Sequence, residues 1–253
     1  MLKLRTFVLL FAVVGAAHAD WKVLTVESEP GRPGIEHRHL VLQDTATGQR
    51  ADLDLAIFSA KSCTLRLIDN PDGQKLASIM KREKCPCGVN GGYFDAKFEP
   101  IGLRIVNGQI IAPLKRARLV TGVLLASARG VQIVRAREFS ERQKIGAAIQ
   151  CGPFLVDASQ RVRGLNESAV ARRTFAATGA NERVLLGLCS EISLAELANI
   201  LATTPIAAEL KIQRALNLDG GSSSAFWFER ENGSVFSIPE RKPVRDSVGV
   251  LPK

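Results

Sequence analysis

The stretch Ala215–Phe228, ALNLDGGSSSAFWF, consists of two apolar segments separated by one acid, two glycines and three serines. Leu216-Asn217-Leu218 is apolar enough to end a strand, and Ala225–Phe228 is apolar enough to form a second, buried one. Gly220-Gly221 permits a sharp turn between them, because glycine adopts backbone angles that other residues avoid. The pattern predicts two core strands interrupted at a sheet edge.

The polar residues at this interruption are candidates for binding or catalysis. Asp219 and the serines after it are expected to face a ligand, with the turn amides forming an anion-binding nest. An acid-capped β-turn with exposed serines is the structural alternative. A nucleophilic serine is improbable, because an α/β-hydrolase needs a histidine after its serine and none follows Ser223.

Composition favours an ordinary globular protein with anionic partners. The 253 residues are 46% hydrophobic and 23% charged, and the formal net charge is +9. Such a charge attracts anions, including phosphate-bearing glycans. The basic residues are scattered apart from Lys115-Arg116-Ala-Arg118, and only 6% of residues are aromatic, so we expect no nucleic-acid binding.

Residues 1–19 have the features of a secretory signal peptide. Lys3 and Arg5 precede an apolar run from Phe7 to Ala17, and Ala17-His18-Ala19 fits a cleavage site. The run is too short to cross a bilayer. We therefore expect a periplasmic or secreted protein that begins at Asp20 and has no stable membrane anchor.

The five cysteines all follow this leader, in a compartment where disulfides persist. We expect at least one intramolecular disulfide, formed by Cys85 or Cys87. After the leader only His37 and His39 remain as histidines, and no second closely spaced cysteine pair follows, so a metal site is not expected.

Turn residues between apolar runs predict mainly antiparallel pairing. Hairpins are expected over 38–59, 103–111, 122–136 and 226–238, the second turning at Asn107-Gly108. A capping box, Ser193-Leu-Ala-Glu196, opens a helix that ends near Thr203, and residues 75–84 form a weaker helix candidate. We predict one α+β domain with an antiparallel or mixed sheet and a few flanking helices. Residues 20–84 would supply its N-terminal strands and helix, and 85–253 its core.

Five segments together resemble the phosphodiester glycosidase family. They are NGGYF (90–94), CGPFLV (151–156), RRTFAATG (172–179), LNLDGGSSS (216–224) and KPVRDSVGVL (242–251). The resemblance implies an α+β domain that hydrolyses a sugar-1-phosphodiester, with N-acetylglucosamine as one candidate sugar. Tyr93 stands where phenylalanine is common and Ser222 where a third glycine is usual, and the latter departure bears on substrate identity.

The resemblance assigns candidate roles to particular residues. Asp219 is the candidate nucleophile or base, and Asp95 is the second carboxylate. Arg173 and Arg245 can bind phosphate oxygens with their planar guanidinium groups. The remaining substrate-binding candidates are Asn90, Gly91, Gly92, Thr174, Asn217, Gly220, Gly221, Ser222 and Ser223. No cofactor is expected, and the oligomeric state is left open. The alternative is a binding module that recognises anionic or phosphorylated cell-surface glycans without cleaving them.

Overall fold

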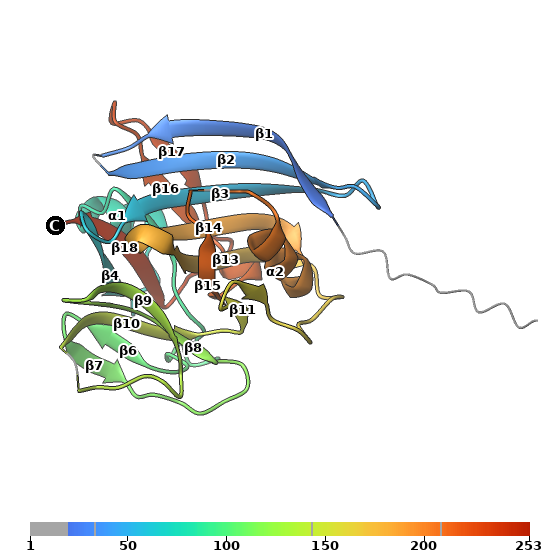
Figure 1. Cartoon of the computed structure of the whole chain (residues 1–253). Coiled ribbons are helices and arrows are strands. Elements are labelled where there is room, and N and C mark those ends of the chain that lie inside the picture. Colours follow the sequence, from blue (N-terminus) through green and yellow to red (C-terminus); the bar gives the residue numbers. More distant parts are fainter. Residues whose placement is uncertain (1–19, 33, 143, 208) are drawn as a thin grey trace, which may run out of the picture.

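The structure is a computed structural model that describes residues 20–253 except 33, 143 and 208. The expected signal peptide, residues 1–19, lies outside the described residues. The described strands form three sheets, and every pairing among them is antiparallel. Figure 1 shows the long N-terminal strands above and the strands of residues 104–151 below. The prediction of a mainly antiparallel structure with few helices is confirmed.

The largest sheet has eight strands in the order β1-β2-β3-β14-β13-β15-β11-β12. They are β1 (Trp21–Pro30), β2 (Ile35–Asp44), β3 (Arg50–Ser59), β14 (Arg183–Ile192), β13 (Ala171–Gly179), β15 (Ile212–Asn217), β11 (Phe154–Asp157) and β12 (Gln160–Arg161). We call it the first sheet.

Two sheets of five strands complete the fold. The second sheet has the order β7 (Gln109–Ala112), β6 (Arg104–Val106), β10 (Ile145–Cys151), β8 (Gly122–Ser127) and β9 (Gly130–Arg135). The third has the order β17 (Val235–Ile238), β16 (Phe226–Glu229), β5 (Cys87–Asn90), β18 (Asp246–Pro252) and β4 (Cys63–Asp69).

All four expected hairpins are present, as the pairs β2–β3, β6–β7, β8–β9 and β16–β17. At the β6–β7 turn, Asn107 and Gly108 have φ angles of 49° and 82°. These positive angles match the twist of a two-residue hairpin turn, which is why an Asn-Gly pair predicts one.

Both helices lie where the sequence indicated. In α2 (Leu194–Thr203), Ser193 Oγ accepts the Glu196 amide at 3.2 Å, and a Glu196 carboxylate oxygen accepts the Ser193 amide at 2.9 Å. This reciprocal capping box satisfies two amides that would otherwise lack acceptors. The shorter α1 (Leu76–Arg82) packs behind the third sheet, whereas α2 covers the outer face of the first.

A central cluster of buried apolar residues is shared by all three sheets. Leu216 comes from the first sheet, Ile149 from the second and Phe226 from the third. The N-terminal strands belong to the same arrangement, since β3 pairs with β14 and β4 with β18. Ala215–Phe228 joins two of these sheets, because β15 lies in the first and β16 in the third. The interruption at Asp219 is the point where the chain passes between them.

The expected disulfide at Cys85 or Cys87 is wrong: all five cysteines are free and buried. Cys85 packs with α1 behind the third sheet, whereas Cys87 points into the central cluster. The two side chains therefore lie on opposite faces of that sheet and cannot bridge. Burial raises the pKa of the Cys87 thiol well above its ordinary value, which favours the neutral form.

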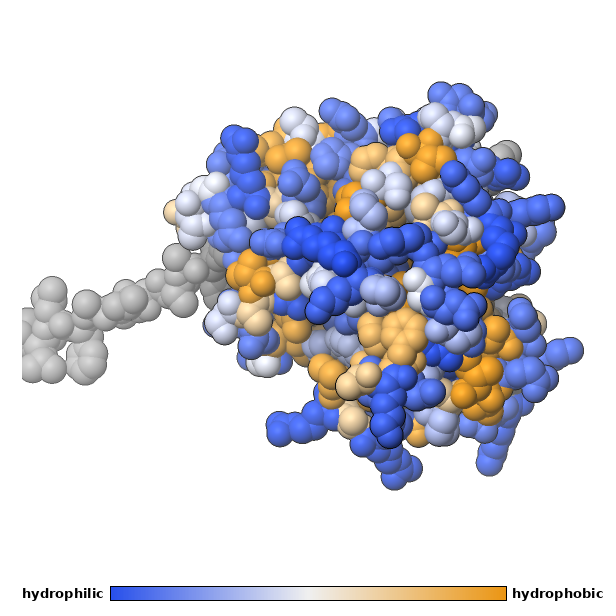
Figure 2. All heavy atoms as spheres, turned by 180° about the vertical axis from the view of Figure 1, so that it is seen from behind, coloured by the Kyte–Doolittle hydropathy of each residue, from blue (hydrophilic) through white to orange (hydrophobic). Residues whose placement is uncertain are grey.

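The surface carries no large continuous apolar area on the face shown in Figure 2, where hydrophilic side chains separate small apolar groups. The large exposed apolar residues are spread over several elements, for example Val26 in β1, Ile110 in β7 and Val235 in β17. Neither helix among the described residues has the length and apolar character required to cross a bilayer.

Candidate active site

Asp219 lies at the junction of the first and third sheets. Its amide donates to the Gly91 carbonyl at 3.0 Å, and its carbonyl accepts the Asn90 side-chain amide at 2.8 Å. The preceding amide, that of Leu218, donates to the Thr174 carbonyl at 2.8 Å. The backbone around Asp219 is thus held by both neighbouring sheets, which fixes where the carboxylate sits.

The Asp219 carboxylate is half-buried, and its surroundings raise its pKa. Burial raises its pKa from 3.8 to about 6, and the Asp246 carboxylate nearby also raises it. Hydrogen bonds from Ser223 and from the Gly220 amide, the latter at 2.9 Å, act in the opposite direction, as does Arg104. A carboxyl group with a pKa near the working pH can both accept and release a proton, which is the property required of a catalytic base.

Asn217 and Tyr93 form a polar floor beside this carboxylate. The Asn217 amide donates to the Tyr93 hydroxyl at 2.9 Å and to the Gly152 carbonyl at 3.0 Å. The Tyr93 hydroxyl donates to the same carbonyl at 2.6 Å. Burial raises the Tyr93 pKa, and the nearby Asp219 charge raises it further, so the phenol stays protonated.

Asn90 and Thr174 are fully buried and support the site from behind. The Asn90 side-chain oxygen accepts the Thr174 hydroxyl at 2.7 Å and the Ala225 amide at 3.0 Å, while its amide binds the Asp219 carbonyl. These bonds leave neither side chain free for a sugar. Both residues therefore position the Asp219 turn.

Arg173 lies on β13, the strand next to β15. It stands two residues before Phe175, which pairs with Asn217, and Asp219 stands two residues after Asn217, so the arginine lies beside Asp219. Its Nε donates to the Ile192 carbonyl at 2.9 Å and one Nη donates to the Ala169 carbonyl. The other Nη, Nη1, lies 3.9 Å from the position that a Cβ on Gly220 would occupy. No carboxylate of the described residues lies within ion-pair distance of this guanidinium, so its charge is available to an anionic ligand.

The glycine turn is braced by the adjacent Arg172. Its guanidinium donates to the Ser224 carbonyl at 2.7 Å and to the Pro239 carbonyl at 3.3 Å. Within the turn, the Gly220 amide is bound to Asp219, and those of Ser223 and Ser224 bond to carbonyls of the turn. Among the described residues, only the Gly221 and Ser222 amides of this turn lack an acceptor, so the expected nest is reduced to two donors.

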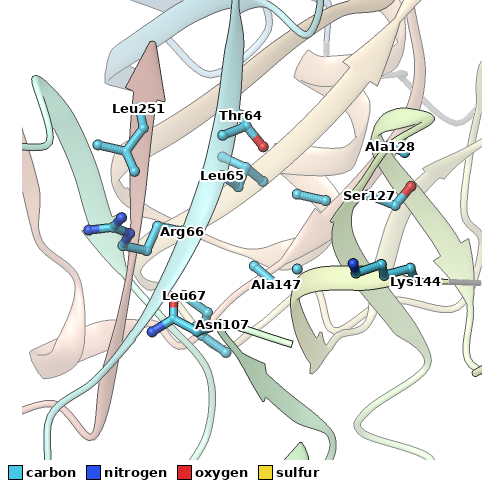
Figure 3. Close-up of a pocket in the computed structure, with 12 residues that line it drawn as sticks. Thr64, Leu65, Arg66, Leu67, Asn107, Ser127, Ala128, Lys144, Ala147 and Leu251 are labelled. Atoms are coloured by element: carbon cyan, nitrogen blue, oxygen red, sulfur yellow. The ribbon is translucent and has the colours of Figure 1, made fainter. Parts of the chain in front are cut away.

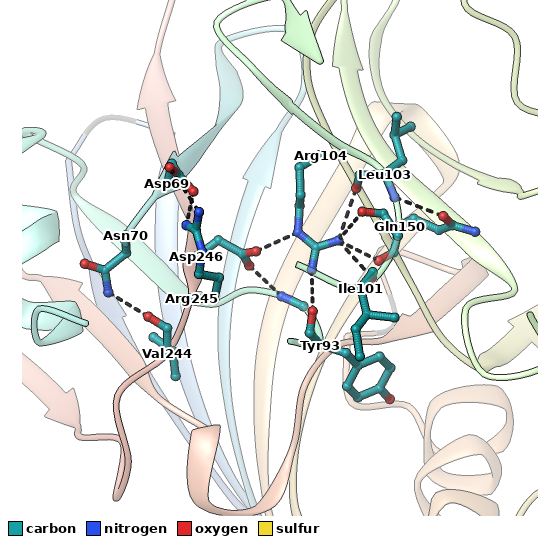
Figure 4. Close-up of polar contacts among 12 residues, drawn as sticks. Asp69, Asn70, Tyr93, Ile101, Leu103, Arg104, Gln150, Val244, Arg245 and Asp246 are labelled. Atoms are coloured by element: carbon teal, nitrogen blue, oxygen red, sulfur yellow. Dashed lines mark hydrogen bonds and ion pairs between the residues drawn. The ribbon is translucent and has the colours of Figure 1, made fainter. Parts of the chain in front are cut away.

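The double glycine Gly91-Gly92 makes room for a buried ion pair. Arg104 Nε donates to one Asp246 oxygen at 2.6 Å, and the Gly92 amide donates to the other at 2.7 Å, as Figure 4 shows. A Cβ on Gly91 would lie 1.8 Å from Asp246 Oδ1, and one on Gly92 would lie 2.4 Å from Arg104 Nη2. The space that the glycines leave is therefore filled by Asp246 and Arg104 rather than open to substrate.

Two predicted residues lie outside this cluster. Asp95 is exposed, and its carboxylate accepts the Lys97 amide at 2.8 Å and the Glu99 amide at 3.0 Å, so it caps a loop turn. Arg245 is ion-paired with Asp69. The structure brings together Asp219, Arg173, Asn90, Asn217, Gly91 and the glycine turn. Ser223 lies beside the Asp219 carboxylate and donates a hydrogen bond to it. The Ser222 carbonyl accepts the Arg241 amide at 2.8 Å.

Sequence reasoning missed Asp246 and Arg104. It also missed that the Tyr93 hydroxyl binds Asn217 and the Gly152 carbonyl. Asp246 stands in the quoted segment KPVRDSVGVL, where an acid at the start of an apolar strand was the available signal. Arg104 had no such signal. It stands in a strand whose three residues, Arg104–Val106, show no alternation from which an inward side chain could be inferred.

A hollow of about 390 Å³ lies at the other end of the second sheet (Figure 3). Ser127 of β8 and Lys144 border it, whereas Asp219 lies near the opposite ends of β8 and β10, where Gly122 pairs with Cys151. None of its lining residues belongs to the Asp219 site.

Within the part of the chain that the structure describes, no three histidine, cysteine or acidic side chains are grouped to hold a metal ion.

Fold and site together define an antiparallel three-sheet protein with a half-buried aspartate at a sheet junction and an arginine without a carboxylate partner beside it. The sequence pattern of the phosphodiester glycosidase family matches residues 83–251 of the 253. The chain therefore belongs to the phosphodiester glycosidase family.

Individual relatives are more distant. The uncharacterized protein YigE of Escherichia coli K12 is 33% identical over 89 residues, which are 32% of this chain and 35% of YigE. The chain thus matches about a third of the length of that curated relative.

Solved structures share the fold at low sequence identity. The catalytic domain of zebrafish N-acetylglucosamine-1-phosphodiester alpha-N-acetylglucosaminidase, auto-inhibited by its pro-peptide, has a TM-score of 0.67 at 15% identity, covering 90% of this chain and 88% of that one. A hypothetical protein from Synechocystis has a TM-score of 0.59 at 14% identity, covering 92% and 68%. A putative exported protein from Burkholderia pseudomallei has a TM-score of 0.59 at 13% identity, covering 82% and 75%.

Proposed function

We propose that this protein hydrolyses the bond between an anomeric carbon and the phosphate of a sugar-1-phosphodiester. The observation that carries the proposal is the Asp219 carboxylate, whose pKa is raised to about 6, at a sheet junction beside the unpaired guanidinium of Arg173. Family membership supports the reaction type. The zebrafish enzyme's name supports N-acetylglucosamine as the first sugar to test.

The leaving group determines what the protein must supply. Cleavage of the C–O bond releases a phosphate monoester, which is a good leaving group without prior protonation, so a second carboxylic acid is needed less than in an ordinary glycosidase. This fits a site in which the second carboxylate, Asp246, is occupied by Arg104 and the Gly92 amide. The demand shifts to stabilising positive charge on the anomeric carbon and negative charge on the phosphate.

Asp219 acts at the anomeric carbon, either as the base that takes a proton from the attacking water or as the nucleophile. In both cases the ionised form is the active one, and its charge stabilises an oxocarbenium-like transition state. The two mechanisms give opposite anomers of the released sugar, so product stereochemistry determined by NMR distinguishes them.

Arg173 and the two free turn amides, of Gly221 and Ser222, bind the phosphate. A planar guanidinium can donate two parallel hydrogen bonds to phosphate oxygens. Asn90 holds the turn through the Asp219 carbonyl, and Asn217 and Tyr93 bind each other and the Gly152 carbonyl beside the carboxylate. We further propose that the protein acts outside the cytoplasm on an anionic glycan, which intact-mass detection of an Asp20 N-terminus in exported protein would support.

The experiment is turnover of matched substrates by the purified protein. N-acetylglucosamine-1-phosphate esterified to glycerol is compared with an aryl N-acetylglucosaminide, and released reducing sugar is measured. We expect hydrolysis of the phosphodiester and a loss of about a hundredfold or more in Asp219→Asn. Binding of the phosphodiester without any release by the wild-type protein would instead indicate a carbohydrate-binding module.

A further inference from the structure

A basic hollow of about 630 Å³ lies on the second sheet. Its rim carries Lys115, Arg116, Arg135 and Arg137, and its apolar part includes Val120 and Phe139. We call it the basic hollow. It contains Lys115 and Arg116 of the basic cluster Lys115-Arg116-Ala-Arg118, which the proposed reaction at Asp219 does not use.

The basic hollow lies at the same end of the second sheet as the Asp219 site. Cys151 of β10 pairs with Gly122 of β8, and Gly122 pairs with Arg135 of β9. Two strand spacings separate Cys151 from Arg135, or about 10 Å. Gly152, whose carbonyl binds Tyr93 and Asn217, is the residue after Cys151, so the polar floor of the site and the hollow lie at the same end of the second sheet.

The loop that carries the cations is fixed to the strand that leads to the site. The buried Gln150 side chain accepts the Lys115 amide at 2.9 Å and donates to the Lys115 carbonyl at 2.6 Å and the Val120 carbonyl at 2.9 Å. A Cβ on Gly152 would lie 2.8 Å from the Thr121 amide nitrogen, so loop and site backbone are in close contact. The backbone of the loop that carries Lys115 and Arg116 is therefore fixed to the end of β10.

The charges in the basic hollow are not balanced. Arg135 is neutralised by Asp157, to which its Nε donates at 2.8 Å. Glu138 accepts the Arg135 amide and pairs with Arg214. Asp95 caps its own turn, and its pKa is lowered first by the backbone hydrogen bond from Glu99 and only last by the charge of Lys115. Among the described residues, no carboxylate lies within ion-pair distance of Lys115, Arg116 or Arg137. Unpaired cations around a concavity attract an anion.

We propose that the basic hollow binds a second anionic group of the same substrate, carried by the aglycone. This inference rests on the proposed function and narrows its substrate class to phosphodiesters whose aglycone bears a further phosphate, as in a glycan with repeated phosphates. The sugar and the scissile phosphate would lie at the Asp219 site, and the second phosphate would lie at Arg116 and Arg137. A small neutral aglycone would leave the hollow empty.

The test compares two ligands that differ by one phosphate. N-acetylglucosamine-1-phosphate is esterified to glycerol or to glycerol carrying a second phosphate, and both Kd and kcat/KM are measured. We expect the wild-type protein to favour the doubly phosphorylated ligand by about tenfold or more, as expected for one added charge-assisted contact. Arg116→Gln with Arg137→Gln should abolish that preference and leave the neutral-aglycone ligand within about twofold.

The matched control removes the same charge elsewhere. Arg50 and Arg129 are exposed residues outside the basic hollow, and Arg50→Gln with Arg129→Gln should keep the preference. Equal loss in both double variants, or no preference in the wild-type protein, would overturn the inference. If neither ligand is hydrolysed, the Kd comparison still decides the hollow, and only the proposed reaction fails. Arg116- and Arg137-dependent binding to phosphatidylglycerol vesicles without discrimination between the soluble ligands would assign the hollow to a membrane surface instead.

Discussion

Arg104 and Asp246 form an ion pair in which both side chains are at most 1% exposed, with 2.6 Å between Nε and Oδ2. Arg104 belongs to the second sheet and Asp246 to the third, so the pair joins two sheets beneath the Asp219 site. The other two guanidinium nitrogens of Arg104 donate to backbone carbonyls, including that of Gln150 at 3.1 Å and that of Tyr93 at 3.0 Å. Each guanidinium nitrogen of Arg104 and each carboxylate oxygen of Asp246 thus has a partner, which a buried pair requires.

Asp246→Asn is expected to destabilise the protein by about 3–5 kcal/mol, because it leaves the Arg104 charge buried without a counter-charge. Thermal unfolding should show a lower Tm, by on the order of 10 °C for a chain of this size. The control is Asp69→Asn, which breaks the partly exposed pair with the neighbouring Arg245 and should cost about 1 kcal/mol or less. Equal effects of the two substitutions would contradict a structural role for the buried pair.

Gly91→Ala tests why the double glycine is present. The added Cβ would lie 1.8 Å from Asp246 Oδ1 and 3.0 Å from the Asp246 carbonyl, so either the ion pair or the backbone must move. We expect a loss of about 1–3 kcal/mol in unfolding free energy, measured by denaturant titration. Gly146→Ala is the control, because its Cβ would come no closer than 3.8 Å to the nearest atom and should be tolerated.

Local signals account for the parts of the fold that the sequence predicts well. The Asn107-Gly108 turn and the Ser193–Glu196 capping box are decided by residues within four positions of one another, and both are confirmed. The division into three sheets depends instead on which distant strands pair, for example β3 with β14. No local pattern determines such a pairing, so the sequence left antiparallel and mixed sheets open.

The site shows the same limit. Asp219 is selected from its own segment, where two glycines mark a break between apolar runs, whereas the candidate role of Arg173 comes from the resemblance of five segments taken together. Asp95 and Asp246 could be told apart only by burial, since one caps an exposed turn and the other meets Arg104 from a different sheet. Residue type and spacing are the same for a turn cap and an ion-pair partner, and tertiary contacts alone distinguish them.

Arg173→Lys is expected to lower kcat/KM for the phosphodiester by about tenfold or more, because lysine keeps the charge but loses the planar fork that binds two phosphate oxygens. Turnover of an aryl glycoside, which has no phosphate, should change by no more than about twofold. Arg245→Lys is the control, since that side chain is paired with Asp69 and should leave both substrates unaffected. The reverse result would assign phosphate binding to Arg245.

The pH dependence of catalysis follows from the ionisation of Asp219. If the carboxylate acts in its ionised form, log kcat/KM should rise with pH and level off above about 6, the value to which burial raises its pKa. The phosphodiester keeps its single negative charge throughout this range, so the limb reports on the protein. A rate that is constant from pH 4 to 8 would exclude Asp219 as the titrating group.

Asp219→Asn should also change stability, in a direction opposite to most substitutions. The folded pKa, about 6, lies above the ordinary value of 3.8, so ionisation costs folding free energy. The contribution of this group to the free energy of unfolding of the wild-type protein is complete below about pH 4 and is lost as pH rises through about 6. Because asparagine never ionises, the variant should match the wild type at pH 4 and exceed it at pH 7 by on the order of 1–3 kcal/mol.

Asp95→Asn provides the control of opposite sign. Backbone hydrogen bonds, first that from Glu99, lower the pKa of Asp95, so its stabilising contribution is present above the ordinary pKa and lost in acid. Its replacement should therefore lower stability at pH 7 and have little effect at the lowest pH at which the protein remains folded. Denaturant unfolding of both variants between pH 4 and 8 measures the difference. If Asp219→Asn were less stable than the wild type at pH 7, burial of the ionised Asp219 carboxylate would not be costing the protein folding free energy.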